Sequence, residues 1–301
     1  MSLLDPAPNL ALISYTRLCQ RREKAACFGY NSLGYCVALK GTAMIRLTYV
    51  LRRLPTLSRQ ECQRYWRYTH GPLVAKHATT LACRKYVQVH TLEDPLNAAF
   101  AEARGLMEPY DGMAELWWNN TEELLQALST PTGQHAAEEL REDEQHFIDF
   151  ARSSMWFAME VPQVNPTPET LVATERSPLI CLIACFRHLS TLSLDDAQLY
   201  WRMHHGPKVR AYAHTARIRR YMQVHMLADP FMDQLRVRRG GMDTPFTGHA
   251  ELWWDRQELI AVLGSPEGMK AAEILLEDER AFIDHARSAF WVAKEHVFID
   301  R

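Results

Sequence analysis

The fold is decided by two near-identical stretches, YWRYTHGP at residues 65–72 and YWRMHHGP at residues 200–207. At the same offset of 135, YVQVH at 86–90 returns as YMQVH at 221–225, and FID at 147–149 returns at 282–284. The segment AELWW at 114–118 returns at 250–254, with an offset of 136. Solenoid repeats have periods of up to about 50 residues. Each copy is instead long enough to be a domain, so the chain is a tandem duplication.

Composition and charge exclude several classes of function. The chain has 301 residues, of which 47% are hydrophobic, and its net charge of −2 gives no reason to expect nucleic-acid binding. No apolar run approaches the ~20 residues that a membrane span needs. Seven cysteines form no CxxC pair, and an odd, scattered set fits a reducing compartment. We therefore expect a cytoplasmic protein that binds neither nucleic acid nor membranes.

The repeat also sets the domain boundaries. Residues 1–43 lie outside the repeat and are interpreted as an N-terminal extension, followed by a first domain at 44–161. Residues 162–178 contain four prolines and few large apolar side chains, which is typical of a semi-extended linker. The second domain spans residues 179–301.

Local patterns predict the elements of one copy. Alternation of apolar and polar residues predicts strands at 45–52, 84–92, 113–118 and 154–161. A capping box at Ser58 begins a helix whose apolar residues are spaced three and four apart, and Gly71-Pro72 is expected to end it. A loop is expected after Asp94-Pro95, and Thr130-Pro131 begins a second long helix. The order β-α-β-β-α-β is that of a ferredoxin-like unit.

The duplication predicts how two such units combine. A four-stranded sheet with helices on one face leaves its other face to be covered, and two copies in one chain can cover it by placing sheet against sheet. We therefore predict an α+β fold in which tandem ferredoxin-like βαββαβ domains form an α+β barrel within one chain, with a lumen between the sheets. The chain would be a monomer with an internal pseudo-dimer, and a homodimer of such chains stays open.

Strand alternation predicts which side chains face this lumen. Val87 and Val89 form an apolar face that suits packing under helices, so the row of Tyr86, Gln88 and His90 is expected to face inward. The same reasoning on the other strands gives a polar, aromatic lumen that could bind a small molecule. The substrate-binding candidates are Arg52, Tyr86, Gln88, Glu115, Trp117, Arg187, Tyr221, Gln223, Glu251 and Trp253.

Four histidines are the catalytic candidates, because imidazole transfers protons near neutral pH and these stand at matched positions of both copies. They are His70, His90, His205 and His225. Each has a structural alternative, since the histidines before Gly-Pro could cap helix C-termini.

The lumen charges could likewise satisfy one another, Glu115 with Arg52 and Glu251 with Arg187. An ionisable residue in a cavity is not always a functional one, so both roles stay open.

Motifs for cofactors are missing. The chain has no GxGxxG, P-loop, HExxH, GxSxG or CxxCH sequence. His77 and His204 could be mistaken for metal ligands, but the repeat replaces them by Tyr212 and Thr69. We therefore expect neither a metal nor an organic cofactor.

At these residues the chain resembles the EthD family of dimeric α+β barrel proteins. The resemblance rests on YWxxxHGP after a capped helix start, then YxQxH and Asp-Pro, in the same order in both copies, and it covers residues 45–161 and 179–296. The family typically pairs two single-domain chains, whereas both halves are fused here. Some members occur in ether-degradation gene sets, others are fungal polyketide decarboxylases or dehydratases without metal or cofactor, and the domain is often labelled an oxidoreductase.

Residues and resemblance together predict a cofactor-independent enzyme that acts on a small hydrophobic, aromatic or polyketide-like molecule. Histidine-mediated proton transfer would make it a lyase of the decarboxylase or dehydratase type. Arg52 and Arg187 would hold a carboxylate or enolate, and the Tyr-Gln rows would donate hydrogen bonds to developing negative charge. The alternatives are an oxidoreductase or monooxygenase-associated protein of ether or aromatic catabolism, and a non-catalytic binder. Because the copies have diverged, one half could hold the only working pocket.

Overall fold

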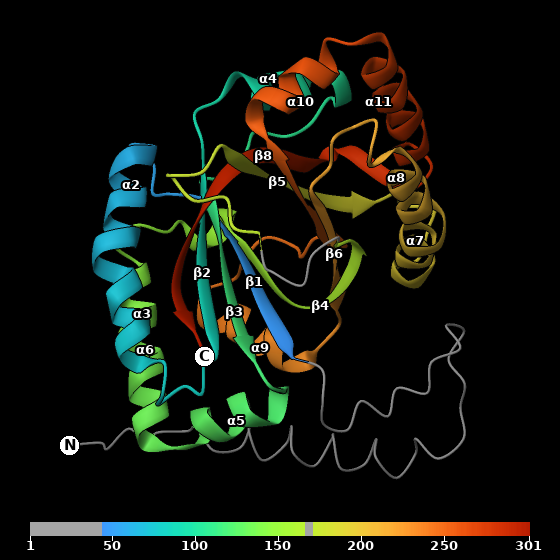
Figure 1. Cartoon of the computed structure of the whole chain (residues 1–301). Coiled ribbons are helices and arrows are strands. Elements are labelled where there is room, and N and C mark those ends of the chain that lie inside the picture. The colour runs from blue at the N-terminus through green and yellow to red at the C-terminus, as the bar shows by residue number, and fades with distance from the viewer. Residues whose placement is uncertain (1–43, 166–170) are drawn as a thin grey trace, which may run out of the picture.

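The structure is a computed structural model that describes residues 44–165 and 171–301 (Figure 1). The predicted extension at 1–43 and part of the predicted linker lie outside the described residues. The first copy contains the strands β1 (Ile45–Leu51), β2 (Lys85–Thr91), β3 (Gly112–Trp118) and β4 (Ser154–Val164), and the helices α2 (Arg59–Tyr65), η1 (Trp66–His70), α3 (Gly71–His77), α4 (Pro95–Arg104), α5 (Thr121–Ser129), α6 (Pro131–Glu144) and η2 (Phe150–Arg152).

The second copy repeats this order without the last short helix. It contains the strands β5 (Leu179–His188), β6 (Arg220–Leu227), β7 (Gly248–Asp255) and β8 (Ile283–Asp300), and the helices α7 (Leu194–Tyr200), η3 (Trp201–His205), α8 (Gly206–Tyr212), α9 (Pro230–Arg238), α10 (Arg256–Leu263) and α11 (Pro266–Glu279). Within the described ranges, no helix is long and apolar enough to cross a membrane.

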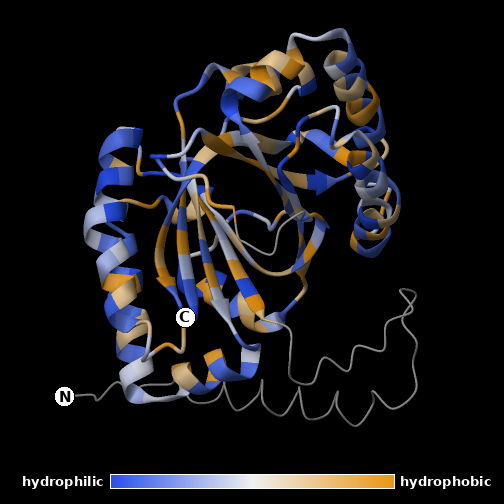
Figure 2. Cartoon of the chain, viewed as in Figure 1, coloured by the Kyte–Doolittle hydropathy of each residue, from blue (hydrophilic) through white to orange (hydrophobic). Residues whose placement is uncertain are grey.

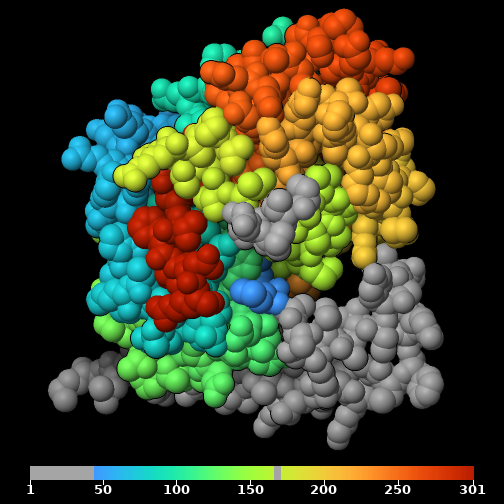
Figure 3. All heavy atoms as spheres, in the orientation of Figure 1, coloured from blue at the N-terminus to red at the C-terminus, as the bar shows by residue number. Residues whose placement is uncertain are grey.

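The strands form one closed barrel in the order β1-β3-β2-β8-β5-β7-β6-β4. Each copy supplies a four-stranded sheet in ferredoxin-like order, and the sheets join where β2 pairs with β8 and β4 pairs with β6, both antiparallel. Figure 3 shows the red C-terminal segment beside the blue and cyan first copy, as this pairing requires. Closure leaves no unpaired edge. The predicted α+β barrel within one chain is confirmed.

Helices cover the barrel on the outside. Apart from α4 and α9, those of the first copy and those of the second lie on different sides of it (Figure 1). Hydrophobic and hydrophilic residues are interleaved along them (Figure 2), as expected where one helix face packs on the sheet and the other meets water.

Two helices stand where loops were expected, and each packs against the other copy. Asp94 accepts a hydrogen bond from the N–H of Leu96, and Pro95 fits the first turn, so the expected loop begins as α4. Asp229 and Pro230 begin α9 in the same way. Figure 1 shows α4 beside α10 and α9 near α5.

These exchanged helices are held by two matched ion pairs. Arg104 on α4 pairs with Glu279 on α11 at 2.7 Å, and Arg239, just after α9, pairs with Glu144 on α6 at 2.8 Å. Each copy therefore helps to build the helical face of the other.

The expected helix end at Gly71-Pro72 is wrong, because the helix continues through a wide π-turn. The N–H of Gly71 bonds to the carbonyl of Trp66, five residues back, and α3 follows with Pro72 in its first turn. Pro72 has no N–H to donate, and the locally widened turn accommodates it without breaking the helix. The second copy has the same π-turn at η3. Such turns re-aim side chains and often occur at functional sites.

The Tyr-Gln-His row secures this π-turn and does not face the lumen. The Trp66 indole donates to the Tyr86 hydroxyl at 3.0 Å, and Gln88 Nε2 donates to the same hydroxyl and to the Trp66 carbonyl, both at 2.9 Å. His90 lies 2.9 Å from Gln88 and stacks on Trp66 with ring centroids 4.7 Å apart. The second copy repeats these contacts through Trp201, Tyr221, Gln223 and His225.

The predicted orientation of β2 and β6 is therefore wrong. Val87, Val89, Met222 and Val224 point into the barrel, where they pack in a buried apolar cluster. Around these positions the barrel interior is filled by apolar side chains, whereas the polar row is needed outside to satisfy the backbone of the π-turn.

A matched pair of glycines tests how tightly the π-turn packs. A Cβ on Gly71 would lie 2.5 Å from Cζ of the Phe298 ring and 2.9 Å from Gln88 Nε2, whereas one on Gly206 would meet the flexible Gln163 end at 2.7 Å. We expect Gly71→Ala to lower the free energy of unfolding by about 1–3 kcal/mol, the usual cost of overpacking, and Gly206→Ala to cost clearly less. Urea denaturation checks this, and equal losses would contradict it.

Candidate functional site

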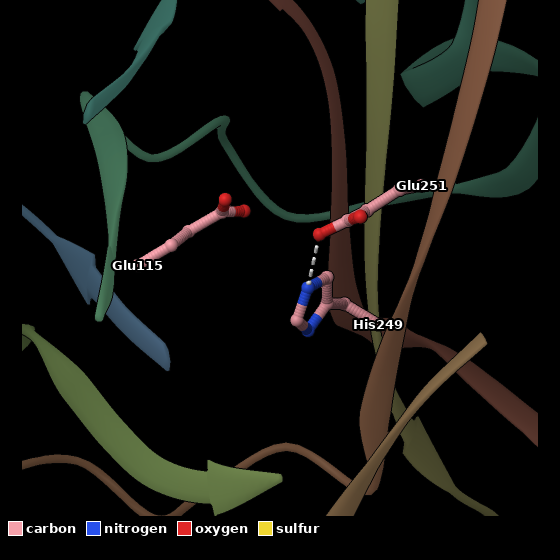
Figure 4. A group of neighbouring side chains, drawn as sticks. All are labelled: Glu115, His249 and Glu251. Atoms are coloured by element: carbon pink, nitrogen blue, oxygen red, sulfur yellow. Dashed lines mark hydrogen bonds and ion pairs between the residues drawn. The ribbon is translucent and has the colours of Figure 1, made fainter. Parts of the chain in front are cut away.

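A charged cluster, and not an open lumen, lies at the centre of the barrel. Arg46 on β1 donates to Glu115 on β3 and to Glu251 on β7, and its Nη2 lies 3.1 Å from Nε2 of His249. Figure 4 shows Glu115 reaching from one sheet toward Glu251 and His249 on the other. Large aromatic side chains, among them Trp156 and Trp291, pack around this cluster. The predicted inward direction of Glu115 and Glu251 is confirmed, but their surroundings are those of a core.

The charges of this cluster are shared between the two sheets. Burial, and then the neighbouring negative charge of Glu251, raises the pKa of Glu115 well above its usual range. Burial acts on Glu251 as well, but Arg46 and His249 outweigh it and lower the pKa of that carboxyl. One guanidinium thus serves two buried carboxyl groups whose pKa values are shifted in opposite directions, and its Nη1 also donates to Glu160 at 3.0 Å.

Three ligand atoms of Glu115, His249 and Glu251 lie within 4.8 Å of one another, a spacing that could suit a metal ion. However, the guanidinium of Arg46 contacts all three side chains and stands where a cation would have to bind. The positive charge of Arg46 therefore takes the place that a metal ion would need among these three side chains.

The predicted ion pairs of the lumen are wrong. Arg52 does not reach Glu115; its guanidinium donates to the carbonyls of Glu108 and Pro109, both at 2.7 Å. Arg187 pairs with Asp243 at 2.8 Å. Both arginines lie at the ends of strands, so their guanidinium groups bind oxygen atoms of nearby loops and not the carboxylates at the centre of the barrel.

The two candidate tryptophans do point into the barrel, near its ends. Trp117 donates to Glu160 at 3.0 Å and Trp253 donates to Glu295 at 2.8 Å. Their predicted inward direction is confirmed, and these contacts satisfy the indole N–H groups as a core requires.

A cavity of about 360 Å³ lies outside the barrel, between the sheet and the helices of the first copy. Its walls are mostly apolar side chains from the outer faces of β1 and β3 and from the surrounding helices, including Leu47, Val74, Leu116, Trp118, Leu124 and Phe231. Helix α9 of the second copy contributes Phe231 and Leu235, so both copies are needed to form it. Cavities of this size and polarity are typical of small-molecule sites.

His70 borders this cavity and is held in one orientation. Its Nδ1 lies 2.7 Å from Asp143, which also accepts a hydrogen bond from the Tyr65 hydroxyl at 2.8 Å. Burial alone would raise the pKa of Asp143, but the hydrogen bonds from His70 and Tyr65 outweigh burial and lower this pKa. The carboxylate therefore accepts a hydrogen bond from the Nδ1–H of His70. Nε2 of His70 has no hydrogen-bond partner among residues 44–165 and 171–301. Sequence reasoning named His70 as a catalytic candidate, and the structure places it at this outer cavity and not in the lumen.

Tyr49 is a site residue that sequence reasoning missed. Its side chain lines the cavity and is 4% exposed, and its hydroxyl has no hydrogen bond of regular geometry to a described residue. The Arg239 guanidinium lies near it, with Cζ 5.8 Å from the centroid of the Tyr49 ring. Burial, and then the negative charge of Glu144, raises the pKa of Tyr49 well above its usual value, so the hydroxyl keeps its proton. The alternation along β1 places Tyr49 opposite Thr48 and Val50, and this was the available signal.

Comparison with known proteins agrees with the duplication. The family model of the EthD domain matches residues 54–151 and again residues 189–286. The chain belongs to the EthD family. Its two EthD domains coincide with the two structural copies, and the family model covers more than half of the sequence. No curated protein matches this EthD chain.

Solved structures share the broad arrangement at low similarity. A "putative monooxygenase" from Lactobacillus acidophilus NCFM has 9% identity and a TM-score of 0.42, and the match covers 85% of the EthD chain and 95% of that protein. A mutant chlorite dismutase from Candidatus Nitrospira defluvii has 11% identity and a TM-score of 0.38, with coverages of 85% and 93%. Similarity at this level carries no argument about the function of the EthD chain.

The second EthD domain has a smaller counterpart of the cavity, about 130 Å³. His205 borders it and lies 2.8 Å from Asp278, as His70 lies beside Asp143. The difference in volume follows from the wall: Leu51, Met155 and Leu235 of the larger cavity are replaced at the matched positions by Phe186, Phe290 and Phe100. Tyr49 is replaced by Ala184, so the second cavity lacks a hydroxyl at this point.

His90 and His225 are poorly suited to proton transfer near neutral pH. Burial lowers the pKa of His225 to about 3, and burial together with the charge of His296 lowers the pKa of His90 well below its usual value. Both stay neutral in the folded protein. Their catalytic role stays a prediction, without support from their position.

The low pKa of His225 predicts a specific pH dependence of stability. The unfolded chain binds a proton at this residue below about pH 6.5, whereas the folded chain does so only near pH 3. Stability therefore falls as pH falls through this window. We expect His225→Gln to reduce the slope of the free energy of unfolding between pH 4 and 6 by about 1.4 kcal/mol per pH unit. Urea denaturation at several pH values measures it, and the slopes above pH 7 should coincide. An unchanged slope in the acid window would contradict the buried, neutral histidine.

Proposed function

We propose that this chain is a cofactor-independent enzyme that acts on a small hydrophobic or aromatic molecule by proton transfer in the cavity of the first EthD domain. The observation that carries the proposal is the free Nε2 of His70, held by Asp143 at the wall of a mostly apolar cavity of about 360 Å³. A cavity of about 150 Å³ already binds benzene, so this one has room for a larger ring system or chain.

The roles of the side chains follow from their chemistry. His70 would take up or give a proton at Nε2, and Asp143 would hold the imidazole and stabilise the charge that develops on it. The protonated hydroxyl of Tyr49 would donate a hydrogen bond to an oxygen that becomes negative during the reaction. Because apolar walls exclude water, these two interactions would be stronger than in solution. A decarboxylation or dehydration of the lyase type needs these two functions.

Untargeted metabolite profiling with the purified protein would test the proposal. The expected result is one small apolar compound that is consumed in air and without oxygen at the same rate. Turnover that stops without oxygen would favour an oxidative role in catabolism. Tight binding with no turnover of any compound would favour a carrier of small molecules.

A further inference from the structure

The mouth of the large cavity carries charged side chains from both copies. Arg141 and Glu138 on α6 pair with each other, with Arg141 Nε 3.0 Å from a Glu138 oxygen, and Arg238 comes from α9 of the other copy. Arg238 is exposed, and no residue in the described part of the chain forms a hydrogen bond or ion pair with it. The pKa of Glu138 is lowered, first by the hydrogen bond from Arg141 and further by the charge of Arg238. Arg238 therefore lies within electrostatic reach of the mouth.

The charges of this mouth leave one positive charge without a partner. Arg141 is balanced by Glu138, and Arg239 is balanced by Glu144, with two hydrogen bonds of 2.8 and 2.9 Å. The guanidinium of Arg238 is left over. A ligand that carries one negative charge would neutralise the charge of Arg238. A doubly charged phosphate would in addition be repelled by Glu138 and Glu144.

The second EthD domain provides an internal comparison. At its smaller cavity the positions of Arg238, Arg141 and Gln134 are taken by Ala103, Leu276 and Met269. The matched positions therefore carry these two arginines only at the larger cavity. Two independent differences, volume and charge, favour the same cavity.

We propose that the first-domain cavity binds a carboxylic acid whose apolar body lies inside and whose carboxylate stays at the mouth, on Arg238. This inference rests on the proposed function and names its substrate class. The planar guanidinium matches a carboxylate with two parallel hydrogen bonds. Burying the charge among apolar walls would be costly, so the carboxylate stays at the wet mouth. The anchor decides which end of the molecule lies inside, beside His70.

Calorimetric titration of the full chain with matched probes tests the inference. The probes are naphthalene-2-carboxylate with naphthalene-2-carboxamide, and decanoate with decanamide. We expect each acid to bind about two- to fivefold more tightly than its amide at low salt, as for an exposed ion pair, and salt to reduce the difference. Arg238→Gln should remove the preference and leave amide binding unchanged.

Two control variants locate the effect. Arg280→Gln removes the same charge from an exposed site on the second copy and should leave the preference intact. Leu235→Trp fills the cavity and should weaken all four probes. Acids and amides that bind equally, or a preference that survives Arg238→Gln, would overturn the carboxylate anchor and leave the proposed cavity in place. Failure of all four probes to bind, or binding that Leu235→Trp does not weaken, would overturn both.

Discussion

Replacing His70 by alanine is expected to lower turnover of the substrate by about 10²–10⁴-fold, the usual cost of removing a general acid or base. The reason is geometric: His70 is the histidine that borders the large cavity and has a free Nε2 beside an orienting carboxylate. Most of the loss should appear in kcat, because the apolar walls that bind the substrate stay in place. Steady-state kinetics on the compound found by profiling measures this effect.

The duplication supplies the matched control. His205 has the same contact with a carboxylate but borders the small cavity, so His205→Ala should leave kcat within about twofold of the wild type. Both variants remove a buried hydrogen bond and should lose a similar amount of stability, about 1–3 kcal/mol. Asp143→Asn, which acts through His70, should lower kcat and shift the pH–rate profile. Equal losses of turnover in His70→Ala and His205→Ala would show that the histidines act on the fold and not on the substrate.

The second large effect is expected at Arg46, the guanidinium at the centre of the barrel. Arg46→Met should lower the free energy of unfolding by about 3–5 kcal/mol, because it leaves buried carboxyl groups without a compensating charge. The residue is 1% exposed and donates to Glu115 and Glu251, which come from the two different sheets. Denaturation by urea at pH 7 measures this loss.

The way in which the stability of Arg46→Met changes with pH distinguishes a loss of charge from a loss of packing. Without Arg46 the pKa values of Glu115 and Glu251 rise in the folded state, so the variant should recover stability as pH falls and the carboxyl groups take up protons. Adding Glu115→Gln and Glu251→Gln to Arg46→Met should restore most of the loss at pH 7. A deficit that is independent of pH, and that persists in the triple variant, would indicate a packing defect.

Some of the site could be predicted from single elements. The inward direction of Glu115 and Trp117 follows from the alternation of β3, because a charged and an apolar face are easy to tell apart there. On β2 the same rule failed. Alternation tells that Tyr86, Gln88 and His90 share a face, but not which face meets the helices, and both faces of this strand are buried.

The cavity itself could not be predicted, because residues far apart in the chain form it. His70 and Tyr49 come from the first copy, whereas Leu235, Arg238 and Arg239 come from α9 of the second. The exchange of α4 and α9 depends on how the barrel closes, and on contacts such as Arg239 with Glu144 that join residues 95 positions apart. A cap at Asp229 predicts that a helix begins there, but not the surface that it covers.

The sequence by itself determined the duplication, the βαββαβ order and the barrel. Periodicity, caps and repeats depend on residues near one another in the chain, so they can be read directly from the sequence. Only the tertiary structure decided that the lumen is a packed core around Arg46, that the π-turn aims His70 at an outer cavity, and that one of two matched cavities is much larger than the other. The physical reason is that these outcomes depend on side-chain volumes and charges that the closed barrel brings together from both copies, such as Arg239 of the second copy with Glu144 of the first.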